Sequence, residues 1–266
     1  MPPFRRARGL LAAGLALSIQ GGHPAAAADL TVGANIGNVP WEFEDASGNY
    51  TGFEVDLVKE VAKRLGKTVE IQNIPFQGLF AAVQSGRIDI ATSSITITEK
   101  RLQSVAFAQP YYDSDQSLTV RADSGLASLD DLKGKVVAVD TGSTGDIWAT
   151  QHQEQYGIAE IRRFEGLNPA MLDLAAGRID GYISDIPALL YYTKDKPGLK
   201  VVQRIPTGEK YSMMFAKGSP LTSQVNDVLT ELKKEGFIAA LHETWFGVKP
   251  DPETTTVQVA EMPATK

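Results

Sequence analysis

A four-residue phrase, Gly-Arg-Ile-Asp, occurs twice in this chain of 266 residues, at 86–89 and again at 177–180. In both copies an apolar pattern of helical period ends at the glycine, which suits the position that follows a helix. A short apolar run comes next, at 88–92 in the first copy and at 179–183 in the second, and it predicts a strand. The chain therefore contains the same helix-to-strand unit twice, 91 residues apart.

Another strand and helix precede each copy of the phrase. The apolar runs at 30–34 and 135–139 predict the strands, and the segments 54–65 and 145–155 predict the helices. Chance recurrence of a common helix ending would explain four matching residues, but it would not explain the matching order around them. Because strands that alternate with helices form parallel sheets covered on both faces, we expect an α/β protein of two lobes.

Polar residues follow the strand in each copy: Ser93 and Ser94 in the first, Ser184 and Asp185 in the second. Ligands of open α/β sheets bind beyond the carboxyl ends of the strands. Two lobes that face each other would therefore present hydroxyl groups on one side of a cleft and a carboxylate on the other. As an alternative, Asp185 would cap the helix that starts at Ile186.

A second group of polar residues follows Ser94. Thr96 and Thr98 stand where a helix is expected to begin, and Arg101 lies about one turn into that helix. Free backbone N–H groups, hydroxyls and a guanidinium suit the binding of a carboxylate. A capped helix with a solvated arginine is the alternative. Arg101 in one lobe and Asp185 in the other would match the carboxylate and the ammonium of a zwitterion.

The segment 140–145, Asp-Thr-Gly-Ser-Thr-Gly, lies between a strand and a helix of the second lobe. Gly142 allows the backbone to approach a ligand closely, and Ser143 and Thr144 offer donors at the start of the helix. The segment lacks the lysine of a phosphate-binding P-loop, so we do not expect a nucleotide. A turn with a helix cap explains the segment equally well.

Three aromatic residues, Trp41, Phe43 and Phe76, are placed near the expected cleft. Their faces are suited to enclose an aliphatic stem or to attract an ammonium group. Core packing is the commoner role of each such residue taken singly.

The N-terminus has the order of a secretory signal peptide: three arginines within residues 5–8, the apolar run 9–19, and small residues up to Ala28. We therefore predict a signal peptide at 1–28. The apolar run is shorter than the roughly 20 residues that a membrane-spanning helix needs. Cleavage would change the formal net charge from −6 to −9, which favours solubility.

The composition excludes several functions. A chain without cysteine has no disulfide, thiol nucleophile, cysteine zinc site or lipid-modified N-terminal cysteine. With 32 acidic residues against 26 basic ones, nucleic acid is not expected as the main partner. Beyond residue 28 the only histidines are His152 and His242, so we expect no catalytic triad, metal or cofactor. Acidic pairs such as Glu42 and Glu44 are interpreted as solvated faces or caps.

The chain resembles the type 2 periplasmic solute-binding proteins of ABC importers, specifically the polar amino acid family. The resemblance extends from about residue 30 to residue 247, which is nearly the whole chain after the signal peptide. The residues that carry it are Pro-Trp-Glu-Phe at 40–43, Gly-Phe-Glu-Val-Asp-Leu at 52–57, Gly-Arg-Ile-Asp at 86–89, Ser-Ile-Thr-Ile-Thr-Glu-Lys-Arg at 94–101, Pro-Tyr-Tyr at 110–112, Leu-Asp-Asp-Leu-Lys-Gly-Lys at 129–135, Gly-Ser-Thr at 142–144 and Thr-Trp-Phe-Gly at 244–247.

The resemblance implies two doubly wound α/β lobes joined by a two-strand hinge and closing over a ligand. The first lobe would comprise residues 29–114 plus 209–248, and the second lobe residues 115–208. Residues 249–266 would form a flexible C-terminal tail. The resemblance further implies that the protein works in the periplasm as a monomer without catalytic activity. It would bind a polar amino acid and deliver it to a membrane permease.

The resemblance also implies roles for site residues. Arg101 would bind the ligand carboxylate with Thr96, Ser143 and Thr144, and Asp185 would accept the α-ammonium beside Ser94. Phe76 would form an aromatic wall of the side-chain pocket.

Two positions depart from the family pattern. Asn38 stands where relatives commonly have a stacking Tyr or Phe, so either the pocket is more polar or Trp41 takes that role. Asn35 stands where some relatives carry an aspartate. Asp140 either faces a basic ligand side chain or caps a helix, and we favour the cap.

Two other functions are open at this point. One is an enzyme on the same fold, for example a dehydratase that acts on a small carboxylate. The other is a ligand-sensing domain of a receptor, which is disfavoured because only a polar segment follows Gly247.

Overall fold

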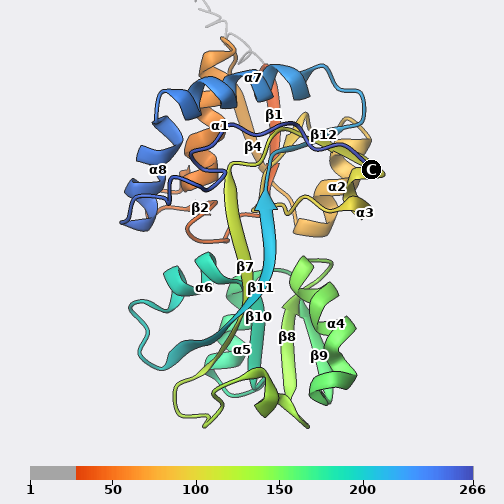
Figure 1. Cartoon of the computed structure of the whole chain (residues 1–266), viewed down its shortest axis with the longest axis vertical. Helices are drawn as coiled ribbons and strands as arrows, with labels where there is room; N and C mark the ends of the chain where they lie inside the picture. Colours follow the sequence, from red (N-terminus) through yellow and green to blue (C-terminus); the bar gives the residue numbers. More distant parts are fainter. Residues whose placement is uncertain (1–27, 266) are drawn as a thin grey trace, which may run out of the picture.

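The computed structural model describes residues 28–265, so the predicted signal peptide lies almost entirely outside the described residues. The described chain forms two lobes, each built around one five-stranded sheet (Figure 1). The strand order is β4-β1-β5-β12-β6 in the first lobe and β11-β7-β10-β8-β9 in the second. Among these residues, no helix has the length and apolar character needed to cross a membrane.

The first lobe, the upper one in Figure 1, contains both ends of the described chain. In its sheet, β1 pairs in parallel with β4 and β5, and β12 pairs antiparallel with β5 and β6. The strands are β1 Leu30–Ala34, β4 Val69–Asn73, β5 Ile90–Ala91, β6 Val105–Phe107 and β12 Met214–Ala216, with a hairpin of β2 Phe43–Glu44 and β3 Tyr50–Thr51. The helices are α1 Phe53–Arg64, α2 Phe76–Gln84, α3 Glu99–Leu102, α7 Leu221–Lys234 and α8 Phe237–Phe246.

The second lobe contains the middle of the chain. Its strand β8 pairs in parallel with β9 and β10, whereas β7 pairs antiparallel with β10 and β11. The strands are β7 Tyr112–Arg121, β8 Val136–Asp140, β9 Glu160–Phe164, β10 Gly181–Asp185 and β11 Leu199–Tyr211. The helices are the 3-10 turn η1 Leu129–Leu132, α4 Thr144–Tyr156, α5 Leu167–Ala175 and α6 Ile186–Thr193.

Both sheets are mixed, so the expectation of purely parallel sheets was wrong. Each antiparallel pairing involves a strand next to the point where the chain crosses between lobes: β7 and β11 in the second sheet, and β12 in the first. A strand that enters a lobe from the other lobe runs opposite to the strands that the lobe's own helices connect. The repeated unit therefore predicts only the parallel part of each sheet.

The hinge consists of β7 and β11, which run side by side between the two lobes (Figure 1). Asp113 on β7 faces Lys210 on β11, and their side chains form an ion pair of 2.7 Å. The register of the pair shifts between Ile205 and Glu209, which indicates a bulge in β11. The chain crosses between the lobes at these two strands, so they set how the lobes face each other.

Apolar residues at helical spacing explain how the helices attach to the sheets. On α1, Val55, Val58 and Val61 are fully buried and the helix ends in two basic residues, as its dipole favours. On α5, Met171 and Leu174 are likewise fully buried. Each lobe has a buried apolar cluster on either side of its sheet, which is the core that two covered faces require.

Residues 249–265 are not the flexible tail that the sequence predicted, because they pack along the first lobe (Figure 1). Thr255 donates from its backbone N–H and from its hydroxyl to Asp113, at 2.8 and 3.0 Å. The carbonyl of Gln258 accepts from Lys233 at 2.9 Å, and the N–H of Ala260 donates to Gln109 at 3.1 Å. Burial lowers the pKa of Lys233 to about 7. The polar composition of residues 249–265 therefore gave no sign in the sequence that this segment packs against the first lobe.

Deleting residues 249–266 should lower the free energy of unfolding by about 2–6 kcal/mol, because the four hydrogen bonds contribute roughly 0.5–1.5 kcal/mol each. Urea denaturation measures the change. A chain that ends at Glu261 keeps all four bonds and is the control. Equal urea midpoints for the two truncated chains would show that the segment does not stabilise the lobe.

Candidate functional site

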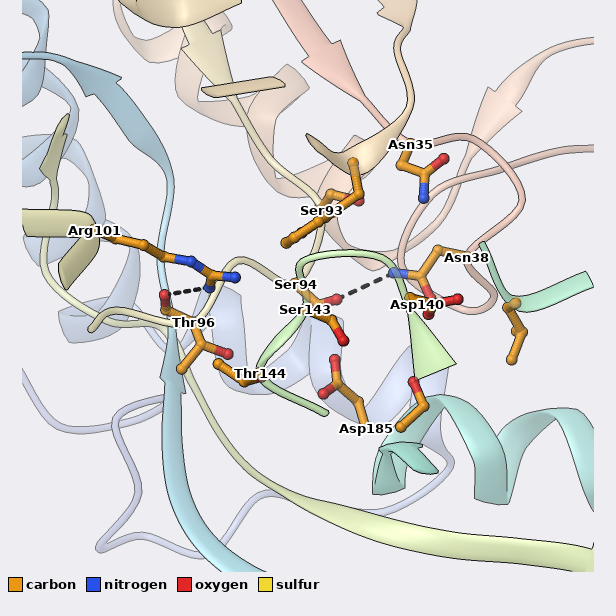
Figure 2. A pocket seen from close by; sticks show the side chains of 13 residues that line it. Asn35, Asn38, Ser93, Ser94, Thr96, Arg101, Asp140, Ser143, Thr144 and Asp185 are labelled. Atoms are coloured by element: carbon orange, nitrogen blue, oxygen red, sulfur yellow. Dashed lines mark hydrogen bonds between the residues drawn. The ribbon is translucent and has the colours of Figure 1, made fainter. Parts of the chain in front are cut away.

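A cavity lies between the lobes, at the carboxyl ends of β1, β5, β8 and β10 (Figure 2). The side chains that the sequence predicted to bind a ligand line it, except Trp41, Phe43 and Thr98. The ring of Phe43 instead meets that of Trp245 edge-on at 5.7 Å. The lining residues are Asn35, Asn38, Phe76, Ser93, Ser94, Thr96 and Arg101 from the first lobe and Asp140, Ser143, Thr144, Leu167, Ser184 and Asp185 from the second. Its volume of ≈ 40 Å³ holds only a few water molecules, so the lobes must separate to admit a larger molecule.

Arg101 enters the cavity from the short helix α3, whose N-terminus is capped by Thr98. The guanidinium donates to the carbonyl of Thr96 at 2.7 Å and, across the cleft, to the carbonyl of Gly142 at 3.4 Å. Arg101 is 8% exposed, and burial lowers its pKa to about 10, so it remains charged at neutral pH. No carboxylate among the described residues forms an ion pair with it. A buried cation of this kind suits an anionic ligand group.

Asp185 closes the opposite side of the cavity at the end of β10. It precedes α6 but makes no capping hydrogen bond there, so the capping alternative does not describe it. Its carboxylate accepts from the side chain of Gln116 at 2.6 Å. Burial, together with the charge of Glu209, raises the pKa of Asp185 to about 8. A cation brought beside this carboxyl group would favour its ionised form.

Glu209 is a buried carboxylate that the sequence analysis missed. It stands on β11 beside the bulge, and its oxygens accept from the hydroxyls of Thr96 at 2.5 Å and Thr144 at 2.9 Å. Gln116 and Thr207 also donate to it, at 2.9 and 3.1 Å. In this structure the two threonines predicted to bind a ligand carboxylate thus bind Glu209. No local pattern marks it, because Thr96 is 113 residues away in the chain.

Ser143 and Thr144 begin helix α4. The hydroxyl of Ser143 caps the helix by accepting from the N–H of Asp146 at 3.0 Å, so the capping alternative is right for Ser143, which also lines the cavity. Gly142 has a φ of 72°, and a Cβ there would lie 2.6 Å from the side chain of Gln77 in the other lobe. The glycine therefore permits close approach of the two lobes.

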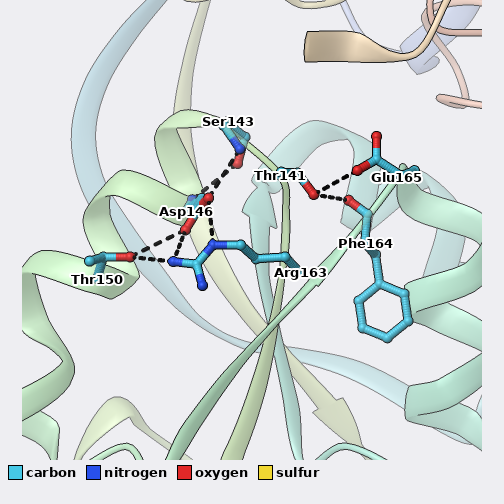
Figure 3. A network of polar contacts seen from close by, with 8 residues as sticks. Thr141, Ser143, Asp146, Thr150, Arg163, Phe164 and Glu165 are labelled. Carbon is cyan, nitrogen blue, oxygen red and sulfur yellow. Dashed lines mark hydrogen bonds and ion pairs between the residues drawn. The ribbon is translucent and has the colours of Figure 1, made fainter.

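A polar network fixes this segment from behind (Figure 3). Asp146 accepts from the N–H of Gly142 at 3.0 Å and from the guanidinium of Arg163 at 3.0 Å. Arg163 also reaches the hydroxyl of Thr150, while Thr141 donates to Glu165 at 3.0 Å. These bonds hold the backbone of 140–144 in one conformation on the cavity wall.

Asp140 lies on the same wall and does not cap the helix, contrary to the interpretation we favoured from the sequence. One carboxylate oxygen accepts from the hydroxyl of Tyr182 at 2.7 Å. The other, Oδ1, is buried, and no hydrogen bond of ordinary geometry reaches it from the described residues, although the nearby N–H of Gly166 favours the charged form. Burial raises the pKa of Asp140 to about 6.

Asn38, Ser93 and Ser94 form the first-lobe wall. The side-chain amide of Asn38 donates to the hydroxyl of Ser94 and to Glu42, both at 3.1 Å (Figure 2). Ser94 has a φ of 43°, an unusual value for a residue with a side chain. Glu42 is fully buried, so its interpretation as a solvated or capping residue was wrong: it lies behind the cavity, not on the surface.

Trp41 does not line the cavity, and this prediction is corrected. It is fully buried in the first-lobe core, where its ring meets those of Phe53, Tyr112 and Tyr211 edge-on at 4.6–5.5 Å. Phe76 does line the cavity, and the guanidinium of Arg101 lies 5.4 Å from its ring centre. Large aromatic residues close to a cleft are difficult to assign from sequence, because the core on the other side of the same loop also needs them.

The two-lobed α/β fold with a cleft between its lobes is that of solute-binding proteins. The family model for bacterial extracellular solute-binding proteins, family 3, matches residues 30–248, and the chain belongs to this family. Its relatives include the L-cystine-binding protein TcyJ of Escherichia coli K12, 32% identical over 222 residues, or 82% of each chain. Another is the arginine-binding extracellular protein ArtP of Bacillus subtilis 168, 30% identical over 82% of this chain and 86% of the relative.

Solved structures agree. The arginine-, lysine-, histidine-binding protein ArtJ of Geobacillus stearothermophilus superposes with a TM-score of 0.79, at 32% identity, over 85% of this chain and 98% of ArtJ. The comparison confirms the expected fold of two α/β lobes.

Replacing Asp185 with Asn should stabilise the protein measured without added amino acids. The pKa of Asp185 is higher in the folded protein than in the unfolded chain. The protein therefore loses stability as the pH rises from the ordinary pKa of this group, 3.8, to about 8. Asn keeps the acceptor for Gln116 and does not ionise. We expect Asp185→Asn to exceed the wild type by at least about 1 kcal/mol in unfolding free energy at pH 8, and by less at pH 5. Urea denaturation at both pH values measures this difference.

Asp195→Asn, an exposed acid of the same lobe, is the matched control and should show no such trend. A constant difference between Asp185→Asn and the wild type at all pH values would contradict the prediction.

Proposed function

We propose that this chain is the amino-acid-binding component of an ABC importer. The observation that carries the proposal is the pair of opposite charges across one closed cavity: Arg101 from the first lobe and Asp185 from the second, neither ion-paired within the described residues. An α-amino acid carries a carboxylate and an ammonium on neighbouring atoms and would compensate both. The family membership and the amino acids named for its relatives support the same ligand class.

In this proposal, ligand binding closes the lobes. Each lobe alone offers charge of one sign, and only the closed form offers both signs, so the ligand shifts the equilibrium toward that form. Contacts between the lobes are already present in the closed arrangement: Arg101 donates to Gly142, and Asn168 donates to Gly37 at 3.4 Å. Both halves of the site belong to one chain, which supports a monomer.

We propose further that the protein works in the periplasm and passes its ligand to a membrane permease. The predicted signal peptide and the extracellular character of the family support export. We infer that its role is binding without catalysis, because its named relatives are binding proteins and the cavity side chains are suited to hold fixed charges. Formation of product from a small carboxylate substrate would instead favour the dehydratase alternative.

The side chain of the ligand is inferred to be cationic. Besides Asp185, Asp140 lines the cavity and Glu209 binds its lining residues Thr96 and Thr144, so three carboxyl groups stand at a site that has one guanidinium, that of Arg101. A neutral zwitterion would leave this excess of negative charge uncompensated. The unpartnered Oδ1 of Asp140, together with the amides of Asn35 and Asn38, is suited to receive a guanidinium or a second ammonium. The arginine-binding relatives are consistent with this ligand.

Arg101→Ala and Asp185→Asn should each abolish amino acid binding while the fold persists. Each variant leaves a buried ligand charge unpaired, which costs about 3–5 kcal/mol, or more than 100-fold in affinity. Isothermal calorimetry with L-arginine, after a thermal-shift screen of the twenty amino acids, measures the loss. Arg87→Ala removes an exposed arginine of the first lobe and serves as the control. Near-native affinity in both site variants would refute the assignment.

Asp140→Asn should change ligand preference. L-arginine and L-citrulline have nearly the same shape but differ in the charge at the end of the side chain, so we expect the wild type to bind arginine more tightly. The substitution removes a charged hydrogen bond, which costs roughly 1.5–3 kcal/mol, or about 10–150-fold for arginine, and should leave citrulline within about threefold.

Competition calorimetry measures both affinities, with the exposed Asp130→Asn as the control. If the wild type prefers citrulline, or if Asp140→Asn weakens both ligands equally, Asp140 does not select the side chain. Binding of no amino acid at all would instead reject the proposed function.

A further inference from the structure

Two carboxyl groups are buried together directly behind the first-lobe wall of the cavity. Glu42 precedes β2, Glu54 lies in the first turn of α1, and both side chains are fully buried. Within residues 28–265, no lysine, arginine or histidine forms an ion pair with either of them. Two adjacent buried anions without a cation would be strongly unfavourable, so one of the two carboxyl groups is expected to carry a proton.

Hydrogen-bond donors surround Glu54. The hydroxyls of Tyr111 and Thr92 donate to it at 2.5 and 2.9 Å, and the N–H of Ser94 lies 3.0 and 2.9 Å from its two oxygens. Its position in the first turn of α1 adds the favourable end of the helix dipole. This environment favours the ionised carboxylate, because the hydroxyls of Tyr111 and Thr92 and the N–H of Ser94 all donate to it.

Glu42 has a different environment. Its Oε1 accepts from the hydroxyl of Ser93 at 2.5 Å and from the amide of Asn38 at 3.1 Å. Its Oε2 is buried and accepts no hydrogen bond from the described residues. The group that Glu42 approaches on this side is the carboxyl group of Glu54. An oxygen in this situation is satisfied when it bears a proton and points it at a carboxylate.

We propose that Glu42 carries a proton on Oε2 at neutral pH, donates it to the carboxylate of Glu54, and through this bond positions Asn38, Ser93 and Ser94 on the cavity wall. Glu42 and Glu54 are positioning residues, since the groups that line the cavity are the amide and hydroxyls that they hold. Among the described residues, the other titratable group that contacts the pair is the phenol of Tyr111. The inference concerns the protein without ligand and does not depend on which amino acid binds.

The electrostatics support this arrangement. Burial, followed by the charge of Glu54, raises the pKa of Glu42 well above its usual range. Burial also raises the pKa of Glu54, but there the hydrogen bonds from Tyr111, Ser94 and Glu42 oppose the rise, whereas at Glu42 the charge of Glu54 adds to it. Because the folded-state pKa of Glu42 is raised, its contribution to stability is present below the unfolded pKa and is lost as the pH rises through the folded pKa. Loss of the proton would remove the hydrogen bond from Glu42 to Glu54 and place two like charges side by side, and their repulsion would displace the Glu42 side chain that holds Ser93 and Asn38.

Carbon-13 NMR of the glutamate carboxyl carbons in the full chain tests where the proton lies. We expect one carbon with the chemical shift of a neutral carboxyl group at pH 7, absent from the spectrum of Glu42→Gln and retained in Glu44→Gln. Glu44 is the matched control because it is exposed and two residues away. If all glutamate carbons are ionised at pH 7, or if the neutral signal disappears only in Glu54→Gln, the proposal is overturned.

Affinity for L-arginine tests the positioning role. Gln at position 42 mimics the protonated acid, so Glu42→Gln should bind within threefold of the wild type at pH 7. Glu54→Gln removes the acceptor of Ser94 and Tyr111 and should weaken binding more than tenfold. The ratio of wild-type to Glu42→Gln affinity should fall where the pH rises through the folded pKa of Glu42, and Asp185 cancels in this ratio because both proteins contain it.

Equal losses in the two variants would refute the positioning role. If the wild type does not bind L-arginine, the proposed ligand is wrong. The positioning role is then tested by the pH dependence of urea unfolding instead of by affinity. The unfolding equilibrium constant of the wild type relative to Glu42→Gln should then grow by up to tenfold per pH unit below the folded pKa of Glu42. No such growth would overturn the proposal.

Discussion

The antiparallel pairing of β7 with β11 is the interaction on which the site depends. These two strands carry the chain between the lobes, and they bring Gln116 and Glu209 into hydrogen bonds with the cavity residues Asp185, Thr96 and Thr144. Glu209 accepts from Thr96 of the first lobe and Thr144 of the second, so the hinge itself holds both walls. The position of every cavity residue relative to the opposite lobe follows from this pairing, because the polypeptide crosses between the lobes only there in the described chain.

The site stores electrostatic free energy. Arg101 and Asp185 are buried and neither forms an ion pair within the described residues, and burial shifts their pKa values toward the neutral forms. A protein selected for stability alone would replace or pair these groups. Their retention in one closed cavity is explained when a ligand supplies the missing charges. Ligand binding is then coupled to closure of the two lobes, since only the closed form brings both charges to the same molecule.

Much of the fold could be predicted because its determinants are local. The repeated phrase marks a helix end and a strand in both lobes, and the expected strand 30–34 is β1 with the same bounds. Arg101 and Asp185 were placed at strand and helix ends by the same logic, and both line the cavity. Burial of Trp41 and Glu42 could not be predicted in this way. Their partners are distant in sequence: Ser93 is 51 residues from Glu42, and the acceptors of the C-terminal segment are more than a hundred residues away.

Asn38 stands where the family resemblance implies an aromatic residue, and its amide fits the layer of charge beneath it. An aromatic ring at this position would cover the ligand but could not donate simultaneously to Glu42 and to Ser94, as the amide of Asn38 does. The amide therefore connects the cavity surface to the buried carboxyl pair, and it keeps that end of the cavity polar beside Asp140. A cationic side chain needs such polar surroundings, whereas an aromatic wall favours an apolar stem. The same substitution thus accounts for the polarity of the cavity and for the link to the groups that support it.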